Sequence, residues 1–560
     1  MSPRAPLPPI LAGSRRGLMA RLLANGVAQA GAMAGIAVAT RHGFDSLHQP
    51  DAAPQWVLAH AAAVALLGLA LMGLRTIERT TAERLGQSYL TATRLRLFDH
   101  LNSLSSRVLQ KRTQGVMMVR FVADLNALND WVGRGLARLA VATITIMSAV
   151  AVLAWLDPLI AACVAGVVAA ALALLATAGG PLYRRVRELR RARGRLAANL
   201  GEKLNAYSPV RVFGRTRGER SRLKKQSRRL AEAAVSQARL AALLRAVPDA
   251  VSTLLTALVL AAGLLQAQRA GWGTLLAAIL VVNLLDSPLR DLGRIFVFWQ
   301  NFRAARDVLG GFLQLPTLAA AGPLPPLATG PGHLALENVT VARALARASA
   351  EAPPGSLVAV TGGGGAGKST LLALAARMFD PDQGAVRLDG QALAEHDLTS
   401  IRQAVGMISP DLPLLRGSIR RNLTYRARAA SAAEIADTLR LCGLQETIAA
   451  LPRGLDTRIA ERGADLPATL RQRLVIARAI MGSPRVVLVD DADAMLDSVR
   501  NDALAQVLRR RAATILLVTS DPRWLAAADL VWRLEAGRIH VVKQTKHLHS
   551  SGNECAVLNR

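Results

Sequence analysis

The chain has 560 residues, of which 51% are hydrophobic and 19% are charged, and its formal net charge is +30. This length exceeds one ordinary hydrophobic core, so at least two domains are expected, and the apolar composition indicates that part of the chain lies in lipid. The basic residues are not interleaved with aromatic ones and accompany no groove-reading motif, which argues against nucleic acid as a partner.

The first half of the chain is predicted to be an all-α membrane domain, residues 18–310. A spanning helix needs about 20 mostly apolar residues. Six stretches qualify, and the first and last contain polar or charged residues: 22–40, 56–74, 136–155, 159–178, 248–267 and 272–296. Residues 1–17 lack the apolar core and cleavage site of a signal peptide, so we expect a cytoplasmic tail.

The distribution of Lys and Arg predicts the orientation of these helices. Taken together, Lys and Arg are frequent in the connections 75–134 and 184–245 and nearly absent from 157–158 and 268–271. Because positive connections stay on the cytoplasmic side, both termini are expected in the cytoplasm. The two long connections carry apolar residues at helical intervals, which predicts that they continue the spanning helices as amphipathic rods.

Asp286 falls inside the sixth apolar stretch, where an ionisable side chain marks a candidate functional site. The alternative is a local ion pair with Arg290 on the same helix face. Residues 311–332 are rich in Pro, Gly and Ala and predict a linker. A second domain is expected over 333–541, and residues 542–560 are expected to form a disordered tail.

The first motif of chemical interest in the second domain is rich in glycine. The sequence GGGGAGKST follows an apolar strand and precedes a predicted helix, and its spacing fits a phosphate-binding loop. Backbone amides and the helix N-terminus hold phosphates, Lys368 reaches the outer ones, and the Ser369 hydroxyl ligates Mg²⁺. A flexible linker, the alternative, does not account for the strand, the helix and the Lys-Ser pair. The predicted phosphate-contacting residues are Gly362, Gly363, Gly364, Gly365, Ala366, Gly367, Lys368, Ser369 and Thr370.

Further along, RVVLVDDADAMLD reads as an apolar strand that ends in carboxylates. Asp490 is placed to hold Mg²⁺ together with Ser369, as in other P-loop proteins. Asp491 is the candidate general base for an attacking water molecule. The second half is therefore predicted to be an α/β P-loop nucleotide-binding domain.

From residue 18 to residue 540 the chain resembles a half-transporter of the ATP-binding-cassette (ABC) superfamily in its exporter architecture. Connecting sequences that carry the resemblance are DPDQGAVRLDGQ, LLRGSIRRNL, LPRGLDTRIAERG, RQRLVIARAI and LEAGRI. The resemblance implies a membrane-embedded ATPase and translocase that uses ATP and Mg²⁺, pairs with a second half-transporter and moves a substrate. The Arg- and Ala-rich composition favours a bacterial source and hence the inner membrane.

The signature loop departs from the family pattern. LSGGQ is replaced by LPATL, in which Pro467 has no backbone N–H and Ala468 restricts the approach that glycine permits. Thr469 still offers a hydroxyl, and the helix N-terminus behind it remains positive. Contact with ATP on the opposite subunit is therefore expected to weaken. The loop consists of Leu466, Pro467, Ala468, Thr469 and Leu470.

Four further departures affect turnover and base binding. The glutamine that senses Mg²⁺ is replaced by Pro410, which has no amide side chain. The catalytic glutamate corresponds to Asp491, one methylene shorter, and the switch histidine to Ser520, which carries no charge near neutral pH. Arg343 lies near the place of the adenine-stacking aromatic, and its planar guanidinium can also stack. The retained residues are Gly367, Lys368, Ser369, Asp490 and Asp497.

Binding residues are kept while turnover residues are lost, so weak hydrolysis by this chain is expected. The leading hypothesis is that it contributes the degenerate site of a heterodimeric exporter. The alternatives are a nucleotide-binding regulatory or scaffold protein of the membrane, and a slow homodimeric exporter. Spans made largely of Ala, Leu, Val and Gly fit lipids, peptides, polyketides or drugs equally well, so the substrate stays open.

Overall fold

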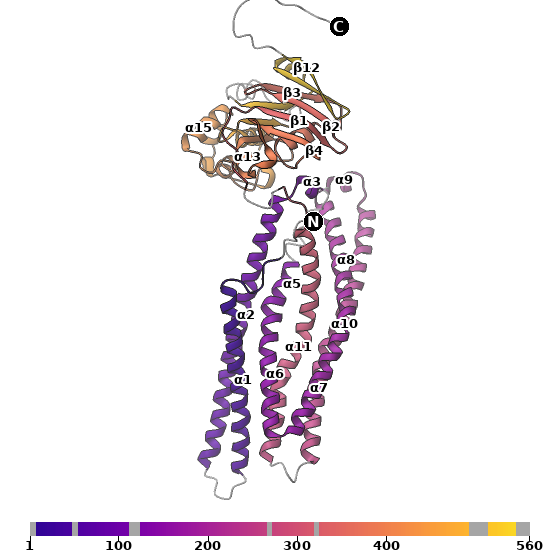
Figure 1. The fold of residues 1–560 in the computed structure, drawn as a ribbon, viewed down its shortest axis with the longest axis vertical. Coiled ribbons are helices and arrows are strands. Elements are labelled where there is room, and N and C mark those ends of the chain that lie inside the picture. Colours follow the sequence, from indigo (N-terminus) through magenta and orange to yellow (C-terminus); the bar gives the residue numbers. More distant parts are fainter. Residues whose placement is uncertain are drawn as a thin grey trace, which may run out of the picture. The chain divides into compact units, whose positions relative to one another are not determined.

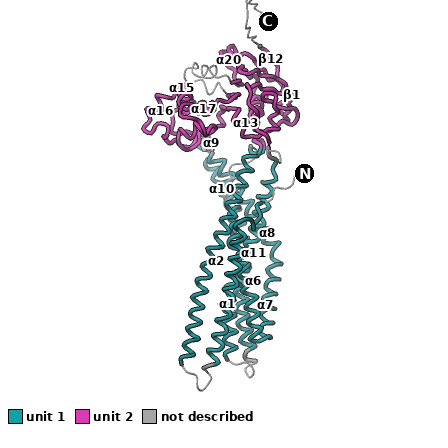
Figure 2. The backbone as a smooth tube through the Cα atoms, turned by 60° about the vertical axis from the view of Figure 1, so that its left-hand side comes forward, with its two compact units in different colours: residues 1–104, 108–316 teal, residues 105–107, 317–560 magenta. Residues whose placement is uncertain are grey.

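The chain forms two compact units (Figure 2). Unit 1 comprises residues 1–104 and 108–316, and unit 2 comprises residues 105–107 and 317–560. The computed structural model describes residues 7–47, 54–110, 124–205, 207–265, 272–318, 324–491 and 513–544.

Unit 1 is a bundle of long helices that run side by side (Figure 1), which confirms the predicted all-α membrane domain. The helices up to residue 313 are α1 (Ser14–Leu47), α2 (Pro54–Ser103), α3 (Ser106–Gln110), α5 (Leu125–Asn129), the π-helix η2 (Asp130–Leu136), α6 (Ala137–Leu156), α7 (Pro158–Thr177), α8 (Gly179–Asn205), α9 (Tyr207–Val212), α10 (Thr216–Leu265) and α11 (Trp272–Leu313).

Five helical segments are long and apolar enough to cross a membrane: α1, α2, the segment from α5 to α6, α7 and α10. The sixth predicted span falls in α11, which is not among these five in the part of the chain that the structure describes. Helix α11 nevertheless contributes buried residues to the same apolar core as α7 and α10. It is thus an integral member of the bundle.

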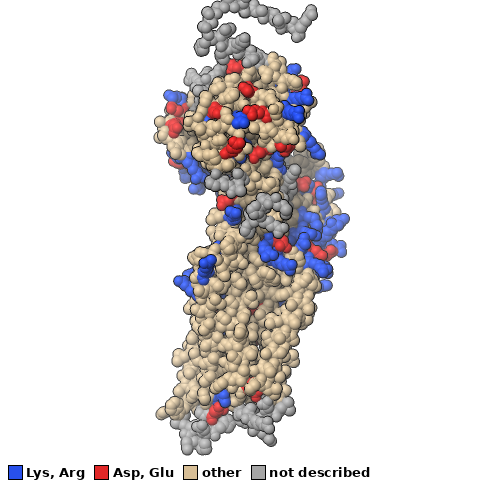
Figure 3. All heavy atoms as spheres, viewed as in Figure 1, with Lys and Arg blue, Asp and Glu red and all other residues tan. Residues whose placement is uncertain are grey.

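The amphipathic rods predicted from the basic connections are present. Helices α2 and α10 each run for 50 residues, from an apolar span through a basic connection, without a break. Helices α7 and α8 are separated only at Ala178. On the face of unit 1 shown in Figure 3, Lys and Arg gather on the end of the bundle that carries α9, and most of the apolar length is bare of charge. The rods and the spans are therefore distinct parts of the same helices.

Asp286 makes the local ion pair that the sequence offered as the alternative to a functional site. Nη2 of Arg290 lies 3.2 Å from Oδ2 of Asp286, and Nε of the same arginine lies 2.7 Å from Oδ1 of Asp249 on α10. Arg290 therefore joins two carboxylates on neighbouring helices.

The described residues of unit 2 form three sheets, as expected for an α/β domain. The mainly parallel sheet has the order β12 (Arg538–Gln544), β11 (Leu530–Glu535), β3 (Leu357–Gly362), β10 (Thr514–Val518), β9 (Val486–Val489), β6 (Val405–Ile408), and only β12 is antiparallel to its neighbour. An antiparallel sheet has the order β2 (Leu345–Ala352), β1 (Leu334–Val341), β4 (Gln383–Leu388), β5 (Gln391–Ala392), and β7 (Gly417–Ser418) pairs with β8 (Arg458–Ile459).

Apolar side chains cover both faces of the parallel sheet. Leu357 and Ala359 of β3 belong to a core that includes α17, whereas Val358 and Val360 belong to a second core that includes α12. This two-sided burial explains the uninterrupted apolar sequence of the strand. The helices of unit 2 are α12 (Lys368–Ala375), η3 (Leu393–Glu395), α13 (Leu398–Ala404), α14 (Ile419–Leu423), α15 (Ala432–Leu441), α16 (Gln445–Ala449), η4 (Gly454–Asp456), η5 (Glu461–Gly463), α17 (Ala468–Ile480) and α20 (Pro522–Ala527).

The ends of regular structure differ slightly from the predicted domain limits. Helix α11 continues to Leu313, inside the predicted linker, and β12 continues to Gln544, inside the predicted tail. The rest of the predicted tail, 545–560, lies outside the described residues.

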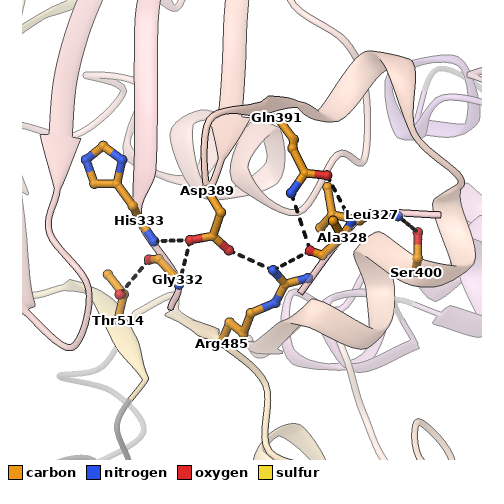
Figure 4. A network of polar contacts seen from close by, with 9 residues as sticks. All are labelled: Leu327, Ala328, Gly332, His333, Asp389, Gln391, Ser400, Arg485 and Thr514. Atoms are coloured by element: carbon orange, nitrogen blue, oxygen red, sulfur yellow. Dashed lines mark hydrogen bonds and ion pairs between the residues drawn. The ribbon is translucent and has the colours of Figure 1, made fainter. Parts of the chain in front are cut away.

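A partly buried ion pair anchors the segment that precedes β1 in unit 2 (Figure 4). Oδ1 of Asp389 accepts hydrogen bonds of 2.7 Å from the backbone N–H groups of Gly332 and His333, and its Oδ2 accepts one of 2.7 Å from Arg485. The Thr514 hydroxyl donates to the carbonyl of Gly332 at 2.7 Å. Because Arg485 immediately precedes β9 and Thr514 begins β10, this segment is tied to two strands that lead to the site described next.

Candidate nucleotide-binding site

The predicted phosphate-binding loop joins β3 to α12, as its sequence requires. Two of its glycines are sterically necessary. Gly362 has φ +150°, and a Cβ at this position would lie 2.5 Å from the carbonyl oxygen of Leu534. Gly367 has φ +103°, and a Cβ at this position would lie 2.6 Å from the carbonyl oxygen of Ala344. Only glycine fits these contacts, and Gly367 caps the N-terminus of α12. The loop is thus built by close backbone packing.

Lys368 folds back over this loop. Its Nζ donates hydrogen bonds of 2.7 Å to the carbonyl of Gly362 and 2.9 Å to that of Gly363. Gly363, Gly364 and Gly365 are exposed, so their backbone is accessible to a ligand. A cation above a loop at a helix N-terminus is an arrangement that suits an anionic ligand.

Ser369 and Asp490 meet at the carboxyl end of the parallel sheet. The Ser369 hydroxyl donates to Oδ1 of Asp490 at 3.2 Å, although the two residues come from α12 and from the end of β9. Burial raises the pKa of Asp490, and the negative charges of Asp491 and Asp411 raise it further, while the hydrogen bond from Ser369 opposes the shift. A hydroxyl and a carboxylate in contact are oxygen ligands that fit Mg²⁺.

The described residues contain no cluster of three or more His, Cys, Asp or Glu side chains that could hold a metal. Ser369 and Asp490 are the side chains of this chain that would hold the ion, whose charge would neutralise the phosphate oxygens.

Arg343 lies in the turn between β1 and β2, next to the phosphate-binding loop. The following residue, Ala344, supplies the carbonyl that packs against Gly367, and Arg343 itself is exposed with φ +65°. The structure therefore brings Arg343 into the neighbourhood of the loop. Its stacking role stays a prediction.

Three residues that the sequence predicts to be replacements in the turnover machinery lie at the carboxyl end of the same parallel sheet. Pro410, Asp491 and Ser520 follow the ends of β6, β9 and β10, which are parallel neighbours, and all three residues are exposed. Asp491 has φ +53°, a conformation that Asp adopts more readily than most residues. Beside Ser520, the Asp521 carboxylate caps α20 and pairs with Arg523 at 2.7 Å. Asp497 lies outside the described residues.

The signature loop, residues 466–470, leads into helix α17. Pro467 precedes α17 and provides no side-chain cap, Ala468 and Thr469 begin the helix, and Leu470 is buried in the core. Leu466 is partly buried against the same core. The role of the loop 466–470 in contacting ATP of a second subunit stays a prediction.

A polar chamber in unit 1 was not predicted from the sequence. A cavity of about 90 Å³ lies among α1, α2, α6 and α11, and positive residues outnumber negative ones in its lining. Its charged residues are Arg75, Glu78, Arg79, Arg138, Asp291 and Arg294. In the sequence, the polar residues that interrupt the first predicted span are the feature that indicates this chamber.

Hydrogen bonds link the helices around this chamber. Gln29 donates to Oε2 of Glu78 at 2.8 Å, and Arg138 pairs with Oδ1 of Asp291 at 2.9 Å. The hydroxyl of Thr145 is buried and has no hydrogen-bond partner among the described residues. A buried hydroxyl of this kind in a polar cavity is a position that water or a ligand atom can satisfy.

The fold and the site define a membrane protein that carries a P-loop nucleotide-binding domain on the same chain. Two family descriptions match it, "ABC transporter transmembrane region" over residues 22–287 and "ABC transporter" over residues 345–494. The chain belongs to the ABC transporter family. It has the exporter arrangement, a helical membrane domain followed by an ATP-binding domain.

Similar proteins include an ATP-dependent lipid A-core flippase of Paraburkholderia xenovorans, 26% identical over 496 residues, which cover 85% of this chain and 82% of that protein. A multidrug efflux ATP-binding/permease protein of Mycobacterium tuberculosis is 34% identical over 346 residues, 59% of this chain and 28% of that protein. The solved structure of a bacterial Atm1-family ABC exporter with ATP bound shares the fold, with a TM-score of 0.84 over 95% of each chain at 23% identity.

Proposed function

We propose that this chain is one half of a heterodimeric ABC exporter of the bacterial inner membrane, with both termini in the cytoplasm, and that it supplies the degenerate nucleotide site. The observation that carries the proposal is the contrast at one sheet edge. Lys368, Ser369 and Asp490 form a connected binding site, while the residues that follow the neighbouring strands are the turnover replacements Pro410, Asp491 and Ser520.

The chemistry of these side chains explains why binding and turnover separate. Lys368 and the N-terminus of α12 attract the phosphates, and Ser369 with Asp490 holds Mg²⁺. A general base must come within hydrogen-bond distance of the attacking water, and the Asp491 side chain is one methylene shorter than the glutamate of the family. Ser520 cannot supply the charge of a histidine. ATP is therefore bound at this site but hydrolysed slowly.

A site that binds ATP but hydrolyses it slowly can contribute to transport when this chain pairs with a different chain. ATP sites of this family form between two subunits, so the partner would place its own signature loop against this chain's phosphate-binding loop. The second site would combine the partner's catalytic residues with the loop 466–470 of this chain. Thr469 and the positive N-terminus of α17 are what this chain offers there.

The test is the purified chain alone, reconstituted in lipid. We expect ATP to bind, with a turnover at least tenfold below the value of roughly 10 per second that is typical of enzymes. Phosphate release and nucleotide binding are measured on the same sample, beside Lys368→Ala, which corrects for contaminating ATPases. Turnover near that typical value that disappears in Lys368→Ala would instead establish a homodimeric exporter, the alternative that the exposed carboxylate of Asp491 leaves open.

The polar chamber of unit 1 supports a second part of the proposal, that the exported molecule is an amphiphile with an anionic group. Asp291 already pairs with Arg138 and Arg294, whereas Arg75 and Arg79 make no ion pair among the described residues. Those two arginines carry positive charge next to an apolar bundle, which favours an anionic head group. The lipid A-core flippase that this chain resembles is named for such a molecule.

Replacing both arginines should weaken the binding of an anionic amphiphile. We expect Arg75→Ala with Arg79→Ala to lower the affinity for lipid A in detergent about tenfold or more, because a hydrogen bond to a charged group is worth about 1.5–3 kcal/mol. Binding is measured by fluorescence quenching, with zwitterionic phosphatidylcholine as the neutral probe and Arg84→Ala, exposed on the same helix, as the matched control. An equal loss for both lipids would contradict the role of charge.

A further inference from the structure

A groove in unit 1, separate from the polar chamber, runs between α8 and α10. It has a volume of about 780 Å³, and its lining consists of Pro181 and Arg185 of α8 and eight residues of α10. Pro181 lies about one helical turn beyond the end of α7 at Thr177. Leu243 lies about as far before residue 248, where the fifth predicted span begins. One end of the groove therefore adjoins the membrane-spanning part of the bundle.

One face of α10 gives the groove an apolar wall that is interrupted by a positive charge. Val235, Arg239 and Leu243 follow one another at intervals of four residues, so they lie on the same face of the helix. Leu243 is 65% exposed and Val235 is 49% exposed. Leu240, which also lines the groove, packs against the core that joins α8 to α10. The wall is thus firmly held and suits a ligand that is both apolar and charged.

Positive charge predominates in the lining. It contains three arginines and one glutamate, namely Arg185, Arg228, Arg239 and Glu232. Arg228 and Glu232 pair with each other at 3.0 Å. Arg185 pairs at 3.2 Å with Glu188, which is outside the lining, and both side chains are about half exposed, so this pair is weak. Arg239 makes no hydrogen bond or ion pair among the described residues. Arg239 and Arg185 can therefore both turn to an anionic ligand.

We propose that this groove binds an anionic phospholipid of the cytoplasmic leaflet. The lipid phosphate lies at Arg239 and Arg185, and the start of its acyl chains lies against Leu243 and Pro181, which are nearer to the spans. Arginine side chains reach the headgroup layer while their stems lie on apolar surface. The inference uses the proposed orientation of the chain, in which α8 and α10 extend on the cytoplasmic side. It does not depend on the chemistry of the nucleotide site.

The charged and the apolar parts of the groove together favour this ligand. A soluble anion would neutralise Arg239 but leave Leu243 and Val235 in water. A lipid without net charge would cover the apolar wall but not balance the excess of arginine. The cytoplasmic leaflet is negatively charged and attracts basic segments close to its surface. An anionic phospholipid meets both requirements.

The experiment titrates the full chain in detergent with fluorescently labelled phosphatidylglycerol and, separately, with phosphatidylcholine that carries the same label. We expect the unmodified chain to bind phosphatidylglycerol about tenfold more tightly, the order expected for one additional hydrogen bond to a charged group. Arg239→Ala combined with Arg185→Ala should abolish this preference. Leu243→Ser should weaken the binding of both lipids, because the apolar wall is interrupted.

Arg245→Ala is the matched control. Arg245 is exposed on the same helix and lies closer to the span, but it is not part of the lining. Its replacement removes the same charge and should leave the preference for phosphatidylglycerol within about twofold of the unmodified value, which is less than 0.5 kcal/mol. An equal loss in Arg245→Ala would assign the preference to the total charge of the rods and overturn the site.

Three further results would also overturn the lipid site. Glycerol phosphate that competes as strongly as phosphatidylglycerol would assign the groove to a soluble anion. A preference that is lost in Arg75→Ala with Arg79→Ala, and kept when Arg185 and Arg239 are replaced, would place the lipid in the polar chamber. An unchanged preference together with a smaller share of dimers in mass photometry of the groove variant would make the groove a contact with the partner chain.

Discussion

Asp491→Glu combined with Ser520→His should raise the ATP turnover of this chain about a hundredfold. General bases contribute roughly 10²–10⁴-fold to the rates of the steps they assist, and the longer Glu side chain would bring its carboxylate nearer to the attacking water. His at position 520 would restore a side chain that can donate a hydrogen bond to the phosphate that is released. Phosphate release by the reconstituted double variant, measured beside each single variant, tests this.

The backbone conformation at Asp491 affects how the result of that experiment is interpreted. Its φ of +53° is tolerated better by Asp than by Glu, so the variant carries some conformational strain. The melting temperature and the affinity for ATP must therefore be measured together with the rate. A well-folded double variant that binds ATP and turns it over no faster would show that Asp491 and Ser520 do not limit hydrolysis, and Pro410 and the signature loop 466–470 would then be the remaining candidates.

The fold was predictable because its signals are local. Long apolar stretches and the helical period of the basic connections predicted the bundle, and the strand before the glycine-rich loop predicted the parallel sheet that β3 occupies. The first span was harder to recognise for a physical reason that only the structure supplies. Asn25 donates to the carbonyl of Leu74 and Gln29 to Glu78, so both polar side chains are satisfied by α2 within the bundle.

The residues of the candidate site that are close in sequence could be predicted. The residues that only the fold brings together could not. Lys368 and Ser369 follow from one motif, and Asp490 from the end of one strand. The bond from the backbone N–H of Asp490 to the carbonyl of Ile408 depends on the pairing of β6 with β9, and the bonds from Arg478 to the turn after β6 depend on the packing of α17. Sequence spacing carries no information on either arrangement, because both join segments more than 60 residues apart.

Lys368→Ala should lower the affinity of the chain for ATP about a hundredfold. The ammonium group donates to the carbonyls of Gly362 and Gly363, and phosphate oxygens would offer it charged acceptors in their place. Two hydrogen bonds between charged groups, at about 1.5 kcal/mol or more each, amount to about 3 kcal/mol, which is about two factors of ten in the dissociation constant. Equilibrium binding of a fluorescent ATP analogue to the detergent-solubilised chain measures the change.

Lys368→Arg is the matched control, because it keeps the charge and changes the geometry. If the positive charge alone holds the phosphates, Arg should retain most of the affinity. If the loop demands a compact ammonium group between two glycine carbonyls, Arg should bind nearly as weakly as Ala. An unchanged affinity in Lys368→Ala would contradict the assignment of this loop as the phosphate site. Under the proposed function, binding is the property on which the contribution of this chain to an exporter depends.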